Sequence, residues 1–505
     1  MVESSLQYST TAEIKQAIET NRQTFKSGVT KSFSFRQRQL ERLWCLLDDN
    51  TDELCQAVAK DLHKHKTETM MEILAAKEEI NEALNDFRKW AKDEKVTPAL
   101  VNRFGTTCYK RKEPKGSVLI ISPWNYPVNL AVSPLIGAIA AGCTAIVKPS
   151  EVSPHTAKLL TDLYARYLDN SAYTVVNGGV PETTLLLEHK WNHIFYTGNG
   201  VVAKIIMRAA AEHFTPVTLE LGGKSPAYID EDANMMVVSR RVAFGKTINA
   251  GQTCIAPDYL LMTAKAEEKF IPELKKALGD MFGADIQASK DYGRIINNRQ
   301  FQRLSKLLNE RQSGDIVIGG KLDEKDLFIA PTVLTNVNRD DKIMEDEIFG
   351  PILPIIRVTD VDDAIEYINS KDDPLALYIF TDKKKVANKI MDSTRSGGIL
   401  VNDTLMHVAE NSLPFGGIGP SGMGNYHGKN TFDTFTHVRA TMVKNLNPLS
   451  EHAQAARYAP FSDRNLRIIR LVIESVPRFK QSFLMKNSSW VVALIAIAVG
   501  YWSFR

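Results

Sequence analysis

Apolar residues recur at three- and four-residue intervals along the first part of the chain, most regularly over residues 36–48 and 66–90. This spacing places the apolar side chains on one face of a helix, so the region 11–90 is predicted to be helical. After Trp90 the chain changes to short β-rich pieces, which indicates strands.

From residue 117 onward, short apolar runs alternate with helical patterns. Continuous apolar strands separated by helices are typical of a parallel, doubly wound sheet. In the first alternating stretch the predicted strands are 117–121, 144–147, 173–176, 193–196 and 216–220, and the predicted helices are 130–141, 154–168, 182–188 and 201–213. In the second stretch, from about 232 to 401, the predicted strands are 259–262, 316–318, 352–357, 376–380 and 398–401. We predict two α/β domains that join at about Gly222.

The composition fits a multidomain globular protein of 505 residues, of which 44% are hydrophobic and 24% charged. Its 62 basic and 59 acidic residues give a net charge of +3, which is too balanced for a protein that coats nucleic acid, so no nucleic-acid partner is predicted. The five cysteines are sparse, which favours a reducing compartment over a disulfide framework. His189 and His193 stand four positions apart without an intervening glutamate, so no metal site is predicted.

The C-terminal part of the sequence differs from the rest. Residues 487–504 carry no charged side chain, and eighteen helical residues span about 27 Å, just short of a bilayer core of roughly 30 Å. The preceding stretch 457–486 has seven basic and two acidic residues, and its apolar residues recur at helical spacing. We predict a basic amphipathic segment followed by a membrane anchor. A core helix, or a helix docked on a partner subunit, is the alternative.

A glycine motif follows the predicted strand 193–196. Gly198, Gly200 and Ala203 have the spacing G-x-G-x-x-A at the start of a helix, where backbone N–H groups can approach a phosphate. A tight turn is the alternative role for these glycines. In dinucleotide-binding folds an acidic residue about 20 positions later binds the ribose, and Glu220 occupies that place. Glu220 is also a candidate for catalysis, and it cannot have both roles.

Three residues with catalytic chemistry stand in loops or at strand ends. Cys254 follows Gly251-Gln252-Thr253, which favours a loop, although an isolated cysteine is most often a small buried apolar residue. Glu220 closes an apolar strand, and Asn125 directly follows the predicted strand 117–121. Ligands of open α/β sheets bind at the carboxyl edge of the strands. A thiol, a carboxylate and an amide together indicate covalent catalysis on a carbonyl group.

Longer motifs, spread over residues 11–444, resemble those of the aldehyde dehydrogenase superfamily. The segments that carry the resemblance are Phe195-Tyr196-Thr197-Gly198-Asn199, the run from Thr215 to Pro226, Gly251-Gln252-Thr253-Cys254-Ile255-Ala256-Pro257-Asp258-Tyr259, Glu345-Asp346-Glu347-Ile348-Phe349-Gly350-Pro351, and Pro414-Phe415-Gly416-Gly417 through Gly428. Segments 254–259 and 426–428 resemble the class 3 branch, and the hydrophobic tail resembles that of the microsomal fatty aldehyde dehydrogenases.

The resemblance implies a role for each candidate residue. Cys254 would be the nucleophile, Glu220 the general base, and Asn125 the oxyanion donor together with the backbone N–H of Cys254. The residues implied for the dinucleotide, NAD with NADP as the alternative, are Trp124, Lys148, Glu151, Gly198, Glu347 and Phe349. Lys148 and Glu151 would hold the adenosine ribose, which leaves Glu220 to catalysis. Ala203 stands where relatives often have glycine, and its methyl group is expected to alter cofactor affinity alone.

The resemblance also implies the architecture: an α/β fold with two doubly wound Rossmann-like domains, a small β oligomerisation element that makes a homodimer, and a C-terminal hydrophobic helix. The implied segments are 1–90 with 114–221 for NAD binding, 222–401 for catalysis, 91–113 with 402–445 for oligomerisation, 446–486 for the basic amphipathic segment and 487–504 for the membrane anchor.

The membrane tail indicates the substrate. An active site at a bilayer suits long aliphatic aldehydes, since each CH₂ group favours apolar surroundings by about 0.8 kcal/mol. We therefore predict oxidation of medium- to long-chain fatty aldehydes to fatty acids. The body would face the cytosol at the endoplasmic reticulum, with the mitochondrial outer membrane, peroxisome and lipid droplet as alternatives. Competing functions are a broad enzyme for aromatic or short aldehydes, a CoA-acylating dehydrogenase and a catalytically silent scaffold.

Overall fold

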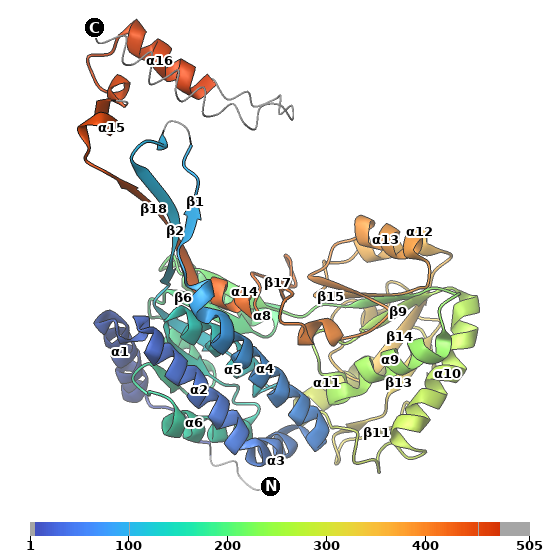
Figure 1. Cartoon of the computed structure of the whole chain (residues 1–505). Coiled ribbons are helices and arrows are strands. Elements are labelled where there is room, and N and C mark those ends of the chain that lie inside the picture. Colours follow the sequence, from blue (N-terminus) through green and yellow to red (C-terminus); the bar gives the residue numbers. More distant parts are fainter. Residues whose placement is uncertain (1–5, 100–101, 453, 475–505) are drawn as a thin grey trace. The chain divides into compact units, whose positions relative to one another are not determined.

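The computed structural model describes residues 6–99, 102–452 and 454–474 (Figure 1). The chain divides into two compact units. The larger unit, which we call the body, contains Met1–Trp90 and Pro114–Thr436, and the smaller, which we call the hairpin unit, contains Ala91–Glu113 and His437–Arg505. The predicted membrane anchor at 487–504 lies outside the described residues.

The body begins with helices, as the spacing of its apolar residues predicts. They are α1 (Thr11–Ser27), α2 (Phe33–Asp49), α3 (Thr51–Leu62) and α4 (Lys66–Trp90). Thr10 and Glu13 form a capping box that starts α1, and Gly28 ends it in a left-handed conformation. The buried face of α4 includes two carboxylates, Glu72 and Glu79. Carboxylates are rarely buried in a core unless they accept hydrogen bonds, and both of these do.

The first sheet of the body has six strands in the order β17-β7-β6-β3-β4-β5. These are β3 (Ser117–Ile121), β4 (Thr144–Lys148), β5 (Tyr173–Val175), β6 (His193–Thr197), β7 (Val217–Glu220) and β17 (Gly422–Met423), with helices α5 (Asn129–Ala141), α6 (Pro154–Tyr167), α7 (Val180–Leu187) and α8 (Gly200–Ala211) between them. The strands are parallel except for the pair β17 and β7. The chain leaves β3 for β4 and β5, then returns to the other side of β3. Ligands of such sheets bind where the order reverses, here between β3 and β6.

The second sheet of the body has seven strands in the order β10-β13-β14-β9-β8-β15-β16. These are β8 (Pro226–Ile229), β9 (Tyr259–Met262), β10 (Asp315–Ile318), β13 (Thr332–Thr335), β14 (Ile352–Arg357), β15 (Ala376–Phe380) and β16 (Gly398–Val401), and its longer helices are α9 (Met235–Thr247), α10 (Ala264–Phe282), α11 (Asn298–Asn309), α12 (Val361–Asn369) and α13 (Lys384–Ser393). Here β10 is antiparallel to β13, and the other pairs are parallel. The prediction of an α/β fold with two Rossmann-like sheets is confirmed.

The sequence-based prediction missed two strands of this second sheet, β8 and β13. β8 begins at Pro226, directly after a glycine-rich loop, and its four residues make an apolar run too short to stand out. Threonines flank the two apolar residues of β13, so the run is too short to stand out. All residues of both strands are buried, so tertiary packing determines these elements.

The hairpin unit contains a three-stranded sheet in the order β1-β2-β18, formed by β1 (Glu94–Val96), β2 (Thr106–Pro114) and β18 (Thr436–Lys444). Helices α15 (Pro448–His452) and α16 (Asp463–Glu474) follow β18. Within the described residues, no helix has both the length and the apolar character needed to cross a bilayer. The unit takes in the predicted oligomerisation segment 91–113, whereas residues 402–436 belong to the body.

Glu79 on α4 forms hydrogen bonds with α5 and with the segment 428–431. Its carboxylate accepts hydrogen bonds from the Ser133 hydroxyl on α5, from the Thr431 hydroxyl at 2.9 Å and from the Gly428 N–H at 3.0 Å. Burial raises the pKa of Glu79 from an ordinary value of 4.5 to about 7, against the opposing effect of these donors. The unfolded chain therefore releases this proton at a lower pH than the folded protein.

Glu79→Gln is expected to remove a stability loss that the wild type suffers as pH rises. Below pH 4.5 the carboxyl is protonated in both states, and above about pH 7 it is ionised in both, so its ionisation opposes folding increasingly across this window. The stability difference between wild type and variant should shift by about 2 kcal/mol between pH 5 and pH 8. Urea unfolding at both pH values measures it. Glu78→Gln, on the exposed face of α4, should show no such shift.

Candidate active site

Several candidate residues lie at the carboxyl ends of strands of the first sheet, and Cys254 lies in a loop before a strand of the second. Asn125 follows β3, Lys148 ends β4, Gly198 follows β6 and Glu220 ends β7, all in the first sheet. Cys254 precedes β9 of the second sheet. The thiol of Cys254 lies close enough to the carboxylate of Glu220 for their charges to interact. The structure therefore brings together residues that are up to about 130 positions apart in the sequence.

The loop before Cys254 has an unusual backbone. Asn249, Ala250 and Gly251 adopt left-handed conformations in succession, with φ of 53°, 50° and 74°. The carboxylate of Glu68 on α4 accepts the Asn249 N–H at 2.9 Å and so stabilises this turn. A side chain at Gly251 would overlap the carbonyl oxygen of Gly350, so glycine is required there. Strained turns of this kind persist where the surrounding structure fixes them, and they are common at active sites.

Cys254 is partly exposed, unlike the buried Gln252 and Thr253 before it. Burial of the thiol, together with the carboxylates of Glu347 and Glu220, raises its pKa to about 12. The N–H groups of Cys254 and Ile255 act in the opposite direction by hydrogen bonding to the sulfur. The thiol is therefore protonated at neutral pH in the free protein, and its activation requires that a base remove the proton.

Glu220 is 2% exposed at the end of β7, and neither of its carboxyl oxygens has a hydrogen-bond partner among the described residues. Burial raises its pKa well above the ordinary carboxylate range. A buried carboxylate without partners is costly, so such a group at a ligand-binding edge indicates a chemical role. When ionised, Glu220 is a stronger base than a carboxylate in water.

Asn125 lies against the loop that carries Cys254. Its side-chain Nδ2 donates to the carbonyl oxygen of Gln252 at 3.0 Å, and the hydroxyls of Tyr126 and Thr253 are 2.8 Å apart. The carbonyl oxygen of Asn125 accepts hydrogen bonds from Asn249 Nδ2 at 2.9 Å and from Lys64 Nζ at 2.8 Å. Asn125 is therefore a firmly held amide donor against the loop that carries the thiol, which is the arrangement expected of an oxyanion donor.

The residues implied for a dinucleotide occupy the first sheet's edge and a loop of the second domain. Lys148 Nζ and Glu151 Oε2 are 2.7 Å apart beyond β4. A side chain at Gly198 would overlap the Tyr196 hydroxyl, and there is open space around Gly200 at the start of α8. The rings of Trp124 and Phe349 meet edge to face, with centroids 5.4 Å apart.

Glu347 is placed by buried charges that the sequence analysis did not single out. Lys224 Nζ donates to the carbonyl oxygens of Ile343 at 2.8 Å and Asp346 at 3.0 Å, and it contacts Asp258 at 2.8 Å. Asp258 in turn accepts the Ile348 N–H at 3.2 Å. These contacts fix the loop 343–348. Burial and the nearby Asp258 raise the pKa of Glu347 to about 8.

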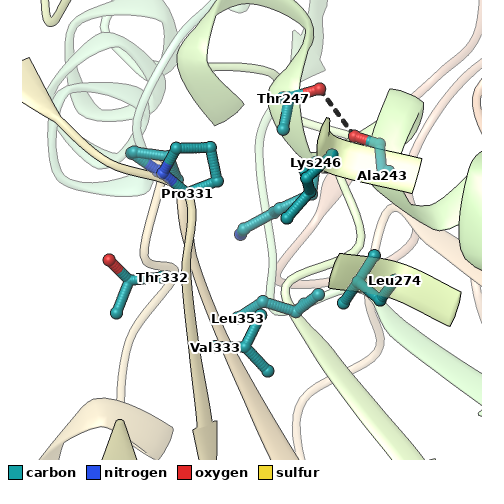
Figure 2. A pocket seen from close by; sticks show the side chains of 10 residues that line it. Ala243, Lys246, Thr247, Leu274, Pro331, Thr332, Val333 and Leu353 are labelled. Atoms are coloured by element: carbon teal, nitrogen blue, oxygen red, sulfur yellow. Dashed lines mark hydrogen bonds between the residues drawn. The ribbon is translucent and has the colours of Figure 1, made fainter. Parts of the chain in front are cut away.

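Lys246 belongs to the same charge group and contacts Asp258 at 3.4 Å. Figure 2 shows its side chain reaching from α9 into a hollow whose lining includes Leu274, Pro331 and Leu353. The residues that line this hollow include none of the candidate catalytic groups. Lys224 and Asp258 stand within the motifs of the sequence analysis, whereas Lys246 lies in a helix where a lysine indicates only solvent exposure.

The two histidines near the C-terminal end of the body are neutral. His427 stacks on Phe415 with centroids 5.1 Å apart, and His407 lies 5.9 Å from the same ring. Burial lowers the pKa of His407 to about 4 and that of His427 to about 3. Across the described ranges, no cluster of three or more His, Cys, Asp or Glu side chains could hold a metal ion.

Comparisons with known proteins agree with this geometry. A model of the aldehyde dehydrogenase family matches residues 2–441. Aldehyde dehydrogenase family 3 member B1 of Bos taurus is 49% identical over 455 residues, which cover 90% of this chain and 96% of the relative. Aldehyde dehydrogenase family 3 member A2 of Mus musculus is 48% identical over 443 residues, which cover 88% of this chain and 90% of the relative. The substrate-bound state of Staphylococcus aureus AldH has a TM-score of 0.84 at 43% identity, with 86% of this chain and 94% of that one covered.

Two doubly wound sheets, with a buried carboxylate at the carboxyl edge of the first and a thiol in the loop before a strand of the second, define a class of oxidoreductases that work with a nicotinamide dinucleotide. Within that class, this chain belongs to the aldehyde dehydrogenase family, in its class 3 branch. Enzymes of the family use NAD or NADP; one relative, from Rattus norvegicus, is a dimeric NADP-preferring aldehyde dehydrogenase at 45% identity over 450 residues, covering 89% of this chain and 98% of the relative.

Proposed function

We propose that this enzyme oxidises medium- to long-chain fatty aldehydes to fatty acids with NAD. The Cys254 thiol and the unpartnered Glu220 carboxylate, held within range of each other's charge, carry the catalytic part of the proposal. The apolar C-terminal sequence carries the substrate part.

Cys254 is the nucleophile in this proposal. Once the proton has left, its thiolate attacks the aldehyde carbon and forms a tetrahedral thiohemiacetal. Asn125 Nδ2 and the Cys254 N–H donate to the oxygen that becomes negative, and each such donor is worth about 3 to 4 kcal/mol. The side-chain NH2 group of Asn125 has two hydrogens, and since one is donated to Gln252, the other is available to the substrate oxygen.

Glu220 is the general base. Collapse of the thiohemiacetal leaves a thioester on Cys254, and Glu220 takes a proton from the water that hydrolyses it. Its raised pKa suits this task, since the ionised carboxylate holds a proton strongly. The same carboxylate, or Glu347, which is also within range of the thiol's charge, can receive the proton of Cys254 in the first step.

The residues at the sheet edge fit a dinucleotide. Glu151 and Lys148 would hold the adenosine ribose, the N–H groups at the start of α8 beyond Gly198 suit a pyrophosphate, and Glu347 with Phe349 would place the nicotinamide end. The dinucleotide, when bound, supplies the acceptor for the hydride that leaves the substrate. Glu151 would repel a 2′-phosphate, which favours NAD, while the adjacent Lys148 makes NADP the alternative.

We further propose a homodimer, with the hairpin unit as the oligomerisation element, because the unpaired edge of a three-stranded sheet needs cover. The uncharged run 487–504 would anchor the enzyme in a membrane, with the body in the cytosol and the endoplasmic reticulum as the expected location. α16 supports this arrangement, since exposed Leu466, Leu471 and Ile473 share the helix with Arg467 and Arg470.

NADH formation with aldehydes from two to sixteen carbons tests the proposal, with full-length enzyme and a form that lacks 487–505 compared in the presence of lipid vesicles. We expect kcat/KM to rise with chain length and the deletion to affect long aldehydes more than short ones. Equal loss at all lengths would favour a broad enzyme for short or aromatic aldehydes. A product that forms only with coenzyme A would instead identify an acylating dehydrogenase.

A further inference from the structure

Lys64 is a buried lysine at the turn between α3 and α4. It is 3% exposed, and the preceding His63 adopts a left-handed conformation with φ of 54° that ends α3. Its Nζ donates to the carbonyl oxygen of Asn125 at 2.8 Å and lies 4.0 Å from the centre of the Tyr126 ring. An ammonium group seldom enters a protein core unless its charge is compensated and its hydrogen bonds are used.

The segment that carries Asn125 is held at its other end by a buried carboxylate. One oxygen of Glu72 accepts hydrogen bonds from the N–H groups of Val128 and Asn129, each at 2.8 Å. Its second oxygen has no hydrogen-bond partner among the described residues and lies 3.9 Å from Lys64 Nζ. Lys64 therefore compensates the charge of Glu72 and also contacts the backbone of Asn125.

We propose that Lys64 is a positioning residue for the amide of Asn125, acting on the oxyanion step of the proposed function, on which this inference rests. Two donors on the carbonyl oxygen of Asn125, from Lys64 and Asn249, fix the orientation of the peptide that follows it. With Glu72 holding the start of α5, the segment 125–129 cannot rotate. The direction of the Asn125 side chain is set by this backbone, so Nδ2 stays at the loop that carries Cys254.

An apolar residue at position 64 would change the environment of both Asn125 and Glu72. Removal of the Lys64 ammonium leaves the carbonyl oxygen of Asn125 with one hydrogen bond, from Asn249, and leaves the charge of Glu72 uncompensated. The Asn125 amide should then sample orientations that do not reach the substrate oxygen. Steps that create an oxyanion should slow, and steps that use only the sulfur should not.

Lys64→Met tests this proposal because methionine fills similar space without charge or donor. We expect kcat/KM for aldehyde oxidation to fall about 10- to 100-fold, somewhat less than loss of an oxyanion donor itself. Alkylation of Cys254 by iodoacetamide, followed by mass spectrometry of the peptide, should stay within about twofold of wild type, since displacement of iodide forms no oxyanion. Lys66→Met, whose exposed ammonium pairs with Asp52 at the surface, is the matched control and should leave both rates unchanged.

A second variant separates positioning from folding. Lys64→Met with Glu72→Gln removes both buried charges, and the amide oxygen of glutamine can still accept the Val128 and Asn129 N–H groups. We expect this variant to fold with wild-type stability and to remain slow in aldehyde oxidation. Oxidation within twofold of wild type in either folded variant, an equal loss of alkylation and oxidation, or failure of both variants to fold would overturn the proposal. The wild-type rate on a fatty aldehyde tests the proposed function separately, because the Lys64 comparison uses any aldehyde that the wild type oxidises.

Discussion

Replacement of Cys254 with alanine is expected to lower kcat/KM for aldehydes by about 10,000-fold or more, because no other group can form the covalent intermediate. Cys254 is partly exposed as a residue, while Glu220 is buried. Removal of one sulfur leaves the strained turn before it and the loop 343–348 intact. The dinucleotide should therefore bind the variant as it binds wild type. Stopped-flow absorbance of NADH measures the first effect, and calorimetric titration measures the second.

Cys45→Ala provides the control for this experiment, since Cys45 is exposed on α2 and far from the site in the sequence. Its turnover should equal that of wild type. Intact-protein mass spectrometry during turnover adds a direct test, because a fatty acyl adduct should appear on wild type and on Cys45→Ala and be absent from Cys254→Ala. Turnover by the Cys254 variant within tenfold of wild type would rule out covalent catalysis at this residue.

Glu220→Gln is expected to release about one NADH per subunit in a first turnover and then to slow by about 100- to 10,000-fold. Glutamine has the shape of glutamate but cannot accept a proton. The thioester should therefore accumulate, because no base activates the water that hydrolyses it. In wild type, burial raises the pKa of Glu220, so hydrolysis should accelerate as pH increases through a range above that of ordinary carboxylates. The variant should lose this rise.

Rapid-quench measurement of the acyl-enzyme distinguishes the two roles that Glu220 can have. Accumulated thioester assigns it to hydrolysis, and a slow first turnover without thioester assigns it to removal of the thiol proton. Normal turnover with a normal pH profile would contradict both roles. Glu212→Gln, at the exposed end of α8, is the matched control and should behave as wild type.

Periodicity predicted the fold of the body well because both sheets are buried on two sides. Strands such as β3 and β15 are continuous apolar runs, and their predicted bounds agree with the structure. The missed strands β8 and β13 are four residues long, and their local sequences do not distinguish them from loops. Their conformation is imposed by neighbouring strands, which sequence periodicity does not reveal.

The candidate site was predictable as far as its residues stand at strand ends or in motifs. Asn125, Glu220 and Cys254 met that condition. The structure places Asn125 and Glu220 at the carboxyl edge of the first sheet, with the Cys254 thiol close enough to the Glu220 carboxylate for their charges to interact. Lys64 did not, because a lysine in the run His63-Lys64-His65-Lys66 has the appearance of a solvated charge. The pattern contains nothing to show that a left-handed turn directs this one ammonium inward, since that direction depends on the packing of α3 against α4.

The pairing of β17 with β7 determines when the first sheet can be completed during synthesis of the chain. Residues 422–423 are synthesised some two hundred positions after Glu220, yet they cover the outer edge of the strand that ends there. Until the ribosome has produced them, the nascent first sheet exposes unpaired backbone groups along β7. The first sheet can therefore be completed only after residues 422–423 have been synthesised, and chains that stop before residue 422 should be prone to aggregate or to require chaperones.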